Sequence, residues 1–228
     1  MRIVGISDIH NDVENLLRFL DKVEQLKPDV LIAMGDFLDV NIPKGFREED
    51  IGRLILEELK SLKKPVFVVP GNFDKKLIEM FEEEGISLHG KAARVREVGF
   101  YGFGGAITPF NTPLEVTEEE IWNGLTRGYK MIEDCKFKIQ VTHIPPFRTK
   151  LDLTITGLHV GSKKVREFIE KFKPHVALCS HIHEGRGIDQ IGETRIINCG
   201  RFPEGYCGLV VIEEGKITTE IVNLNVLE

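Results

Sequence analysis

Five short polar motifs directly follow apolar, strand-like runs of the sequence. They are Asp8-Ile9-His10, Gly35-Asp36-Phe37-Leu38-Asp39, Gly71-Asn72-Phe73-Asp74, His143-Ile144-Pro145-Pro146 and Ser180-His181-Ile182-His183. Open α/β sheets place their ligand sites at the carboxyl ends of strands, so these motifs are expected to meet at one edge. In an Asp-x-His or His-x-His pair on extended backbone both side chains share a face and can reach one ion. A single motif of this kind is also typical of a turn or helix cap, but the five together predict a metal site.

The donor types indicate which cations would suit that site. Carboxylates, imidazoles and one amide oxygen are present without a thiolate, which favours Mn²⁺, Fe²⁺ or Zn²⁺ over a soft ion. Four of the 7 histidines follow apolar runs, where burial without a partner would be costly. Two cations about 3.5–4 Å apart, bridged by a carboxylate, lower the pKa of a shared water and favour in-line displacement at phosphorus. The motifs therefore favour phosphoryl transfer to water.

The elements that position the first three motifs alternate between strand and helix. Apolar periodicity predicts strands at 2–7, 30–34 and 66–69 and helices at 13–23, 51–62 and 76–84. This order indicates parallel strands joined by crossover helices.

After Gly85 the alternation is interrupted. Short strands are predicted at 93–98 and 100–103, then a loop over 104–113, a helix at 118–134 capped by Thr117, a strand at 138–142, a helix at 165–172 and a strand at 176–179. The tail contains only strands, at 188–191, 194–198, 208–212 and 217–223, which we expect to be antiparallel with a hairpin turn at 213–216. Two facing sheets with helices outside both would accommodate this order. No repeat or linker divides it, so one domain spanning 1–228 is expected.

Bulk composition narrows the function classes. The formal charge of -6 argues against a protein whose affinity comes mainly from neutralising a nucleic-acid backbone. No apolar run approaches the roughly 20 residues of a membrane span, and the N-terminal segment has no export signal. The four cysteines are predicted to be buried thiols of a reducing compartment. We expect a cytoplasmic protein without a membrane partner, and the sequence leaves a homo-oligomer open.

The ordered set of motifs resembles the calcineurin-like metallophosphoesterase superfamily, with a match running from Asp8 to His183. The chain looks most like the small archaeal and bacterial phosphoesterases related to the cyclic-AMP phosphodiesterase group. The resemblance implies a four-layer α-β-β-α sandwich with two facing mixed sheets. It also implies a hydrolase of a small phosphodiester or phosphomonoester, such as a nucleotide. The cofactors would be two divalent ions, drawn from Mn, Fe, Zn or Ni, and a hydroxide that bridges them would attack in line.

Carried over position by position, the resemblance assigns the ligands to two ions. One ion would be held by Asp8, His10, Asp36 and His183, and the other by Asp36, Asn72, His143 and His181. Asp36 would therefore bridge, and Asp36, Asn72 and His143 are the catalytic candidates.

The remaining motif residues have lesser implied roles. Asp39 would order its loop rather than bind metal. Asn72, Phe73 and Arg201 are candidates for substrate binding. Arg201 follows Asn198-Cys199-Gly200, which is similar to the Asn-Pro-Gly turn of the family.

Three positions depart from the family pattern: Ser180 for glycine, Cys199 for proline and Phe73 for the histidine of Gly-Asn-His-Asp. That histidine is thought to protonate the leaving oxygen, which a phenyl ring cannot do. Either the leaving group needs no acid, or Asp74 or a bound water supplies the proton, or the activity is weak. Phe73 is alternatively an apolar wall against a nucleobase or aryl group.

Two further functions stay open. One is a binding scaffold of the same fold that has lost catalysis, as in the retromer subunit of this architecture, and the other is a nuclease, which the acidic balance disfavours. Outside the motif, His89, His159 and His175 are expected to be structural. The loop over 102–111 is either a substrate-pocket loop or a plain connection, because it lacks the ending of a phosphate-binding P-loop.

Overall fold

Runs of β-branched and aromatic residues form two sheets in the computed structural model, which describes residues 1–227. The first sheet has the strand order β11-β10-β1-β2-β3 and consists of β1 (Arg2–Ile6), β2 (Val30–Ala33), β3 (Val66–Val68), β10 (Tyr206–Glu213) and β11 (Lys216–Asn223). The second has the order β4-β5-β6-β7-β9-β8 and consists of β4 (Ala92–Val95), β5 (Val98–Phe103), β6 (Phe137–Thr142), β7 (Val176–Cys179), β8 (Gly187–Ile191) and β9 (Thr194–Asn198).

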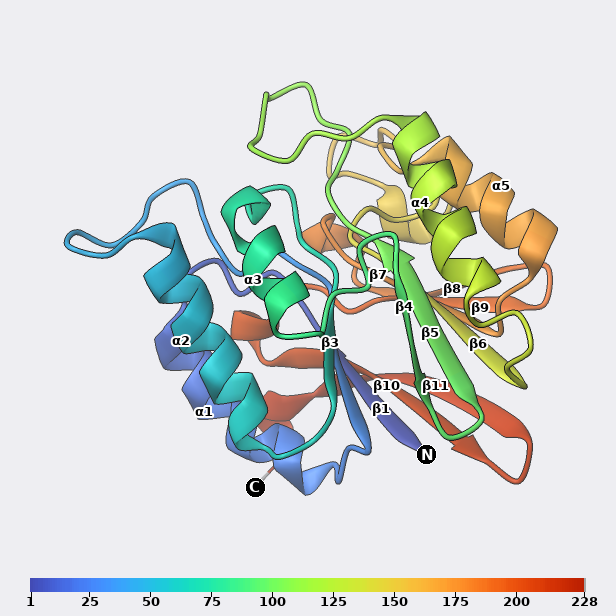
Figure 1. Ribbon diagram of the computed structural model, residues 1–228, viewed down its shortest axis with the longest axis horizontal. Coiled ribbons are helices and arrows are strands. Elements are labelled where there is room, and N and C mark those ends of the chain that lie inside the picture. Colours follow the sequence, from blue (N-terminus) through green and yellow to red (C-terminus); the bar gives the residue numbers. More distant parts are fainter. Residues whose placement is uncertain (228) are drawn as a thin grey trace.

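Helices cover the outer face of each sheet (Figure 1). The first sheet carries α1 (Val13–Gln25), α2 (Glu48–Ser61) and α3 (Ile78–Glu83), and the second carries α4 (Glu118–Lys130) and α5 (Lys163–Phe172). Each helix buries one apolar stripe, as Leu16, Leu20 and Val23 do on α1. A third apolar cluster, which includes Ile32 and Val141, fills the space between the sheets. The predicted four-layer α-β-β-α sandwich is confirmed.

Parallel pairing brings the motif-bearing loops to one edge of each sheet. In the first sheet β1 pairs with β2 and β2 with β3 in parallel. In the second, β5, β6, β7 and β9 form a continuous parallel series. Carboxyl ends of parallel strands lie at the same edge of a sheet, so the five motifs share an end of the sandwich.

Some element predictions were wrong in detail. The tail is not purely antiparallel, because β9 pairs in parallel with β7 as well as antiparallel with β8. The strand expected at 93–98 ends at Val95, since Arg96 adopts a left-handed φ of 54° and turns the chain into β5. The expected helix at 118–134 ends at Lys130, although Thr117 does cap it and Glu120 completes a capping box.

The four cysteines are buried and free. None of the helices within residues 1–227 combines the length and apolar content that crossing a bilayer requires.

Candidate metal centre

The loops after β1 and β2 are joined through their backbones. The N–H of Asp8 donates to the carbonyl of Gly35 at 3.0 Å, and the N–H of His10 donates to the carbonyl of Asp36 at 3.0 Å. Asp8, His10 and Asp36 have left-handed φ values of 52°, 50° and 50°. Such backbone is unfavourable for residues with a Cβ and is concentrated at functional sites. Strain therefore accompanies the placement of three predicted ligands.

The loops after β2 and β3 approach each other closely at Gly71. A Cβ at Gly71 would collide with the carboxylate of Asp36, which explains why only glycine fits there. The N–H of Phe73 donates to Oδ1 of Asp36 at 3.1 Å. The two loops thereby aim the Asp36 carboxylate.

Asp74 is the residue whose role the sequence did not reveal. It is 0% exposed, and its carboxylate accepts the N–H groups of Gly71 at 2.8 Å, Leu38 at 3.1 Å and Phe37 at 3.3 Å. Burial and then the charge of Asp36 raise the pKa of Asp74 to about 7. Its oxygens face backbone donors, so Asp74 joins the loops that carry Asp36 and Asn72. The signal available in the sequence was an aspartate closing a Gly-x-x-Asp turn.

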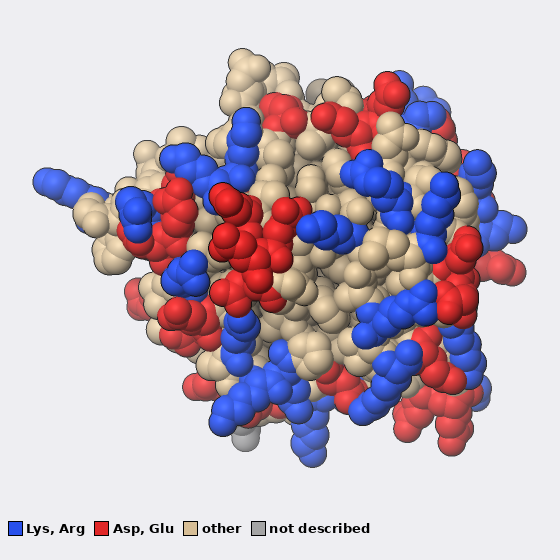
Figure 2. Space-filling model, viewed as in Figure 1, with Lys and Arg blue, Asp and Glu red and all other residues tan. Residues whose placement is uncertain are grey.

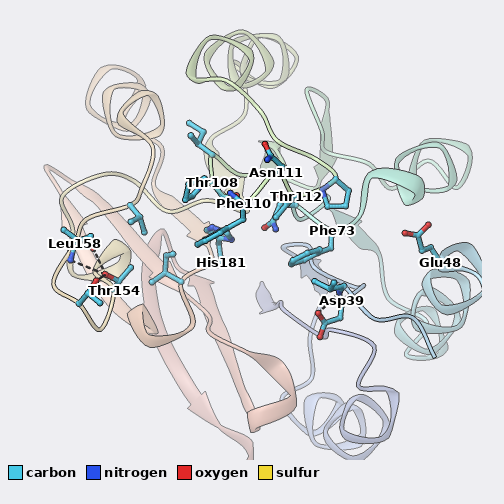
Figure 3. A pocket seen from close by; sticks show the side chains of 18 residues that line it. Asp39, Glu48, Phe73, Thr108, Phe110, Asn111, Thr112, Thr154, Leu158 and His181 are labelled. Carbon is cyan, nitrogen blue, oxygen red and sulfur yellow. Dashed lines mark hydrogen bonds between the residues drawn. The ribbon is translucent and has the colours of Figure 1, made fainter. Parts of the chain in front are cut away.

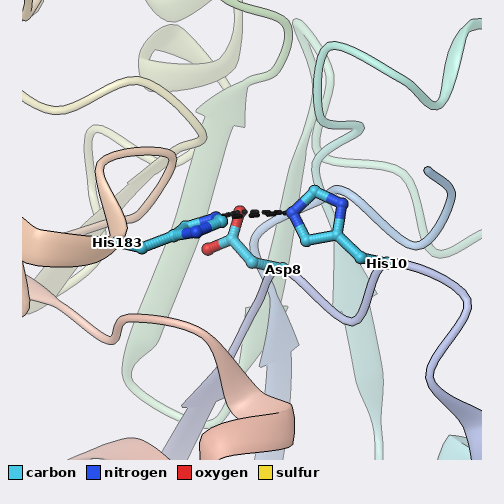
Figure 4. Close-up of side chains that lie close together, drawn as sticks. All are labelled: Asp8, His10 and His183. Atoms are coloured by element: carbon cyan, nitrogen blue, oxygen red, sulfur yellow. Dashed lines mark hydrogen bonds and ion pairs between the residues drawn. The ribbon is translucent and has the colours of Figure 1, made fainter. Parts of the chain in front are cut away.

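The first donor group contains Asp8, His10 and His183 (Figure 4), whose ligand atoms lie within 4.8 Å of one another. Nε2 of His10 lies 3.3 Å from Nε2 of His183, and both face Oδ1 of Asp8, at 3.9 Å and 3.5 Å. Oδ1 of Asp8 is buried and has no hydrogen-bond partner among residues 1–227. A buried acceptor of this kind is costly unless a cation or proton satisfies it, so the arrangement fits a divalent ion.

The second donor group contains Asp36, His143 and His181. Nδ1 of His143 contacts the carbonyl of Met34 at 2.6 Å, a hydrogen bond that directs Nε2 towards Asn72 Oδ1 at 3.1 Å and Asp36 Oδ2 at 3.3 Å. Nε2 of His143, Oδ1 of Asn72 and Oδ2 of Asp36 can all act as acceptors. Because they lie so close together, a proton or a cation must lie between them. A backbone partner on the far nitrogen is the usual second contact of a metal-binding histidine.

The pKa values of the two imidazoles in this group are shifted in opposite directions. Burial lowers the pKa of His143, but the charge and hydrogen bond of Asp36, helped by Asp8 and the carbonyl of Met34, together raise the pKa to about 9. Burial and the nearby His143 lower the pKa of His181 to about 4. Perturbations of this size in opposite directions are typical of functional sites.

Asp36 faces both groups. Its Oδ2 lies 3.3 Å from Nε2 of His143 and 3.9 Å from Nε2 of His10. Burial raises the pKa of Asp36, whereas His143 lowers it, and the lowering prevails. A carboxylate that is ionised and lies between two donor groups has the position that a bridging ligand needs.

Ser180 and the Asn198-Cys199-Gly200 turn support the loop that carries His181 and His183. The hydroxyl of Ser180 contacts Oδ2 of Asp8 and lies 2.6 Å from the Ser7 hydroxyl. Asn198 is fully buried; its Oδ1 accepts the N–H of Gly200 at 2.9 Å and its Nδ2 donates to the carbonyl of Ile182 at 2.8 Å. Ser180, in the place of a glycine, therefore holds a predicted ligand in position.

Three predicted residues lie beside the donor groups rather than in them. The carboxylate of Asp39 accepts the neighbouring N–H of Val40 at 2.6 Å. Phe73 is half-buried, and its ring meets that of His10 edge-on at 6.0 Å between centroids. The third residue is Arg201, whose positive charge acts on His183. Burial lowers the pKa of His183 and Asp8 raises it by a larger amount, so the pKa is raised, and the charge of Arg201 opposes that increase.

The histidines outside the motif have other partners. Nδ1 of His89 accepts the N–H of Gly104 at 3.0 Å, and Nδ1 of His175 accepts that of Lys138 at 3.1 Å. Nδ1 of His159 lies 2.8 Å from the buried carboxylate of Asp152. Each of these histidines thus supports a loop or strand end.

Comparison with known proteins defines the class to which the fold and donor groups belong. Residues 1–185 match the family model described as calcineurin-like phosphoesterase, and the chain belongs to this family. It is 36% identical over 207 residues to an uncharacterized protein from Methanocaldococcus jannaschii, with 87% of each chain covered. It is 26% identical over 184 residues to a protein named a probable glycerophosphodiester phosphodiesterase from Arcobacter nitrofigilis, an alignment that spans 77% of this chain and 64% of that protein.

Solved structures show the same fold. TT1561 of Thermus thermophilus superposes with a TM-score of 0.72 at 20% identity and covers 98% of both chains. A dimetal phosphatase from Danio rerio has a TM-score of 0.71 at 11% identity, covering 98% of this chain and 96% of that one.

Proposed function

We propose that this protein hydrolyses phosphoesters with two divalent cations. Asp8, His10, Asp36 and His183 would hold one cation, and Asp36, Asn72, His143 and His181 the other. Membership of the calcineurin-like phosphoesterase family supports the reaction class. The observation that carries the proposal is the convergence of buried and partly buried donors. Above all, Oδ1 of Asp8 lies among imidazoles and has no hydrogen-bond partner within the described part of the chain.

Each residue has a role that follows from its contacts. Bound cations would supply Lewis acidity that makes water nucleophilic near neutral pH and offsets charge on the phosphoryl oxygens. Asp36 would help to hold both cations, because its carboxylate accepts the N–H of Phe73 and faces both donor groups. Met34 would hold the ring of His143 through Nδ1, leaving Nε2 for the site. Arg201, whose positive charge acts on His183, would meet an anionic substrate.

The proposal is tested by release of p-nitrophenolate from bis-p-nitrophenyl phosphate after the chelated protein is reloaded with Mn²⁺, Fe²⁺, Zn²⁺ or Ni²⁺. This leaving group is stable as an anion, so the phenyl ring at position 73 does not limit the assay. We expect turnover that disappears on chelation and returns with metal. Absence of turnover with every one of these ions would contradict the proposal.

A catalytically inactive scaffold is the second candidate, and Phe73 is the observation that favours it. The two candidates differ in what Phe73→His does to an ester whose leaving group needs a proton: the substitution should raise the activity of a hydrolase that lacks only an acid, and should leave a scaffold inactive. A nuclease is less well supported, because Lys and Arg are intermixed with Asp and Glu on the face in Figure 2 rather than forming one basic surface.

A further inference from the structure

A large pocket opens beside the second donor group. Its volume is about 810 Å³, within the range of ~300–1,000 Å³ that holds small-molecule ligands, and its lining includes Asn72, Phe73 and His181. Two of the loops that form its walls are a 107–113 loop between β5 and α4 and a 154–160 loop between β6 and α5 (Figure 3). Asp39, Val40 and Glu48 also line it, from the segment between β2 and the start of α2. The pocket therefore adjoins the place where a phosphoryl group would bind.

The 107–113 loop is attached to the donor loops themselves. The N–H of Leu114 donates to the carbonyl of Asn72 at 2.8 Å, and the N–H of Gly105 donates to that of Pro70 at 2.8 Å. A group bound against this wall is thus positioned relative to Asn72. The Gly-rich stretch at 102–111, for which the sequence left a pocket loop or a plain connection open, contributes Ile107, Pro109 and Phe110 to the lining.

Exposed apolar side chains are concentrated at this pocket. Phe110 is 79% exposed, Val40 71% and Leu158 64%, and all three line it. Ile107 and Val160, also in the lining, are 37% and 36% exposed. A contiguous apolar surface of this kind is uncommon on a soluble protein unless it meets an apolar ligand or partner.

The hydroxyl groups in the lining are already used within their own loops. Thr108 and Thr112 both donate to the carboxylate of Glu115, Thr112 at 2.7 Å. Thr154 lies 2.9 Å from the Thr156 hydroxyl and 3.1 Å from the carbonyl of Leu158. The hydroxyls of these threonines are therefore engaged within their own loops. Outside the donor groups, the amide of Asn111 is left as the main lining side chain that could recognise the polar edge of a nucleobase.

The charges in the lining disfavour a polyphosphate. Its residues include no Lys or Arg, and its two charged members, Asp39 and Glu48, are acidic. Oε2 of Glu48 forms an ion pair with Nζ of Lys76 at 2.5 Å, and Lys76 is not part of the lining. A substrate with a second anionic group in this pocket would meet repulsion, whereas an uncharged chain would not.

We propose that the substrate is an amphiphilic phosphoester, with its phosphoryl group at the donor groups and a long uncharged aliphatic chain in the pocket. The inference rests on the proposed function and adds the chemical class of the substrate. Each methylene that the pocket fully buries would improve binding about 4-fold. Because the pocket is open at Phe110 and Leu158, part of a bound chain stays in water and the gain per methylene is smaller.

The test is a chain-length series of p-nitrophenyl alkyl phosphates, from methyl through butyl to octyl, assayed with Mn²⁺-loaded protein below the micelle concentration. We expect kcat/KM to rise at least about 10-fold from methyl to octyl. The double variant Phe110→Ser with Leu158→Ser should flatten this dependence on chain length. The matched control, Met131→Ser with Val226→Ser, changes two residues that are 52% and 73% exposed and lie outside the pocket, and should keep it.

Two further measurements separate the inference from the proposed function. The p-nitrophenyl ester of thymidine 5′-monophosphate should be a poorer substrate than the octyl ester; a preference for it, or equal rates along the alkyl series, would overturn the inference while leaving phosphoester hydrolysis intact. Titration calorimetry of octyl phosphate against methyl phosphate, with metal-free protein, tests the pocket without catalysis. Tighter binding of octyl phosphate supports the inference even if no ester is hydrolysed, and equal binding contradicts it.

Discussion

The donors of the metal centre and the walls of the pocket beside it differ in burial and in what their polar groups do. Asp8 and His143 are 0% exposed, and backbone hydrogen bonds fix the loops around them. In the pocket, Phe110 is 79% exposed, and the lining hydroxyls are bonded within their own loops. The centre has a buried oxygen, Oδ1 of Asp8, that lacks a hydrogen-bond partner among residues 1–227, and the pocket has apolar surface that is exposed. On the proposals made above, the first would hold cations and the second an apolar group, so one region would set the reaction and the other the choice of substrate.

Removing the charge that faces both donor groups should have the largest effect. Asp36→Asn keeps the size of the side chain but removes the negative charge between His10 and His143. We expect kcat on bis-p-nitrophenyl phosphate to fall by about 10³-fold, because an interaction that organises a charged site is worth several kcal/mol. The control is Asp21→Asn, an exposed carboxylate on α1. Wild-type activity in Asp36→Asn, with the fold intact by circular dichroism, would rule out a bridging role.

Position 73 lies where the two regions meet, because Phe73 contacts His10 and also lines the pocket. Phe73→His introduces a group that can protonate a leaving oxygen. For a phenyl ester, whose leaving group needs a proton, we expect kcat to rise by up to about 10²-fold. For a p-nitrophenyl ester the rate should change little. Equal effects on both esters would show that the substitution acts through the pocket or the fold and not through proton donation.

The sequence predicted the centre better than the pocket, for a physical reason. Residues of metal-ligand type, such as Asp8 and His143, directly follow strands. Parallel pairing brings the carboxyl ends of strands together irrespective of the conformation of the loops. The role of Asp74 was missed because three backbone N–H groups bind it, and backbone contacts leave little trace in residue type. Apolar residue types occur both in exposed loops and in buried cores, so the sequence alone does not show that Phe110 and Leu158 are exposed; the structure does.

The 154–160 wall should depend on one buried carboxylate. Asp152 is 0% exposed and accepts the N–H groups of Thr149 at 2.8 Å and of Arg148 and Gly161 at 3.0 Å. Asp152→Ala leaves these donors without a partner, and we expect a loss of about 2–3 kcal/mol in the free energy of unfolding. Urea titration measures it, with the exposed Asp134→Ala as a control. Limited proteolysis should cut the variant first within 154–160; an unchanged cleavage pattern would show that other contacts hold this wall.

The smallest expected effect is a pH dependence of the free energy of unfolding that comes from His89, which lies beside the 107–113 wall. Nδ1 of His89 accepts the N–H of Gly104, which precedes this wall, and the ring stacks on Phe103 at 4.1 Å between centroids. Burial lowers the pKa of His89 from 6.5 to about 4, so the folded protein keeps the ring neutral in a range where the unfolded chain takes up a proton.

The sign of the pH effect follows from that difference. A lowered pKa contributes stability that is fully present above pH 6.5 and is lost as the pH falls towards 4. Between pH 7 and pH 5 the loss attributable to His89 is about 2 kcal/mol of unfolding free energy. His89→Gln keeps an acceptor for the N–H of Gly104 but does not titrate, so its stability should fall less than that of the wild type over this interval. Urea titrations of both chelated proteins at the two pH values measure the difference. If both proteins lost the same free energy of unfolding, the ring of His89 would not be kept neutral in the folded protein, and water would reach it.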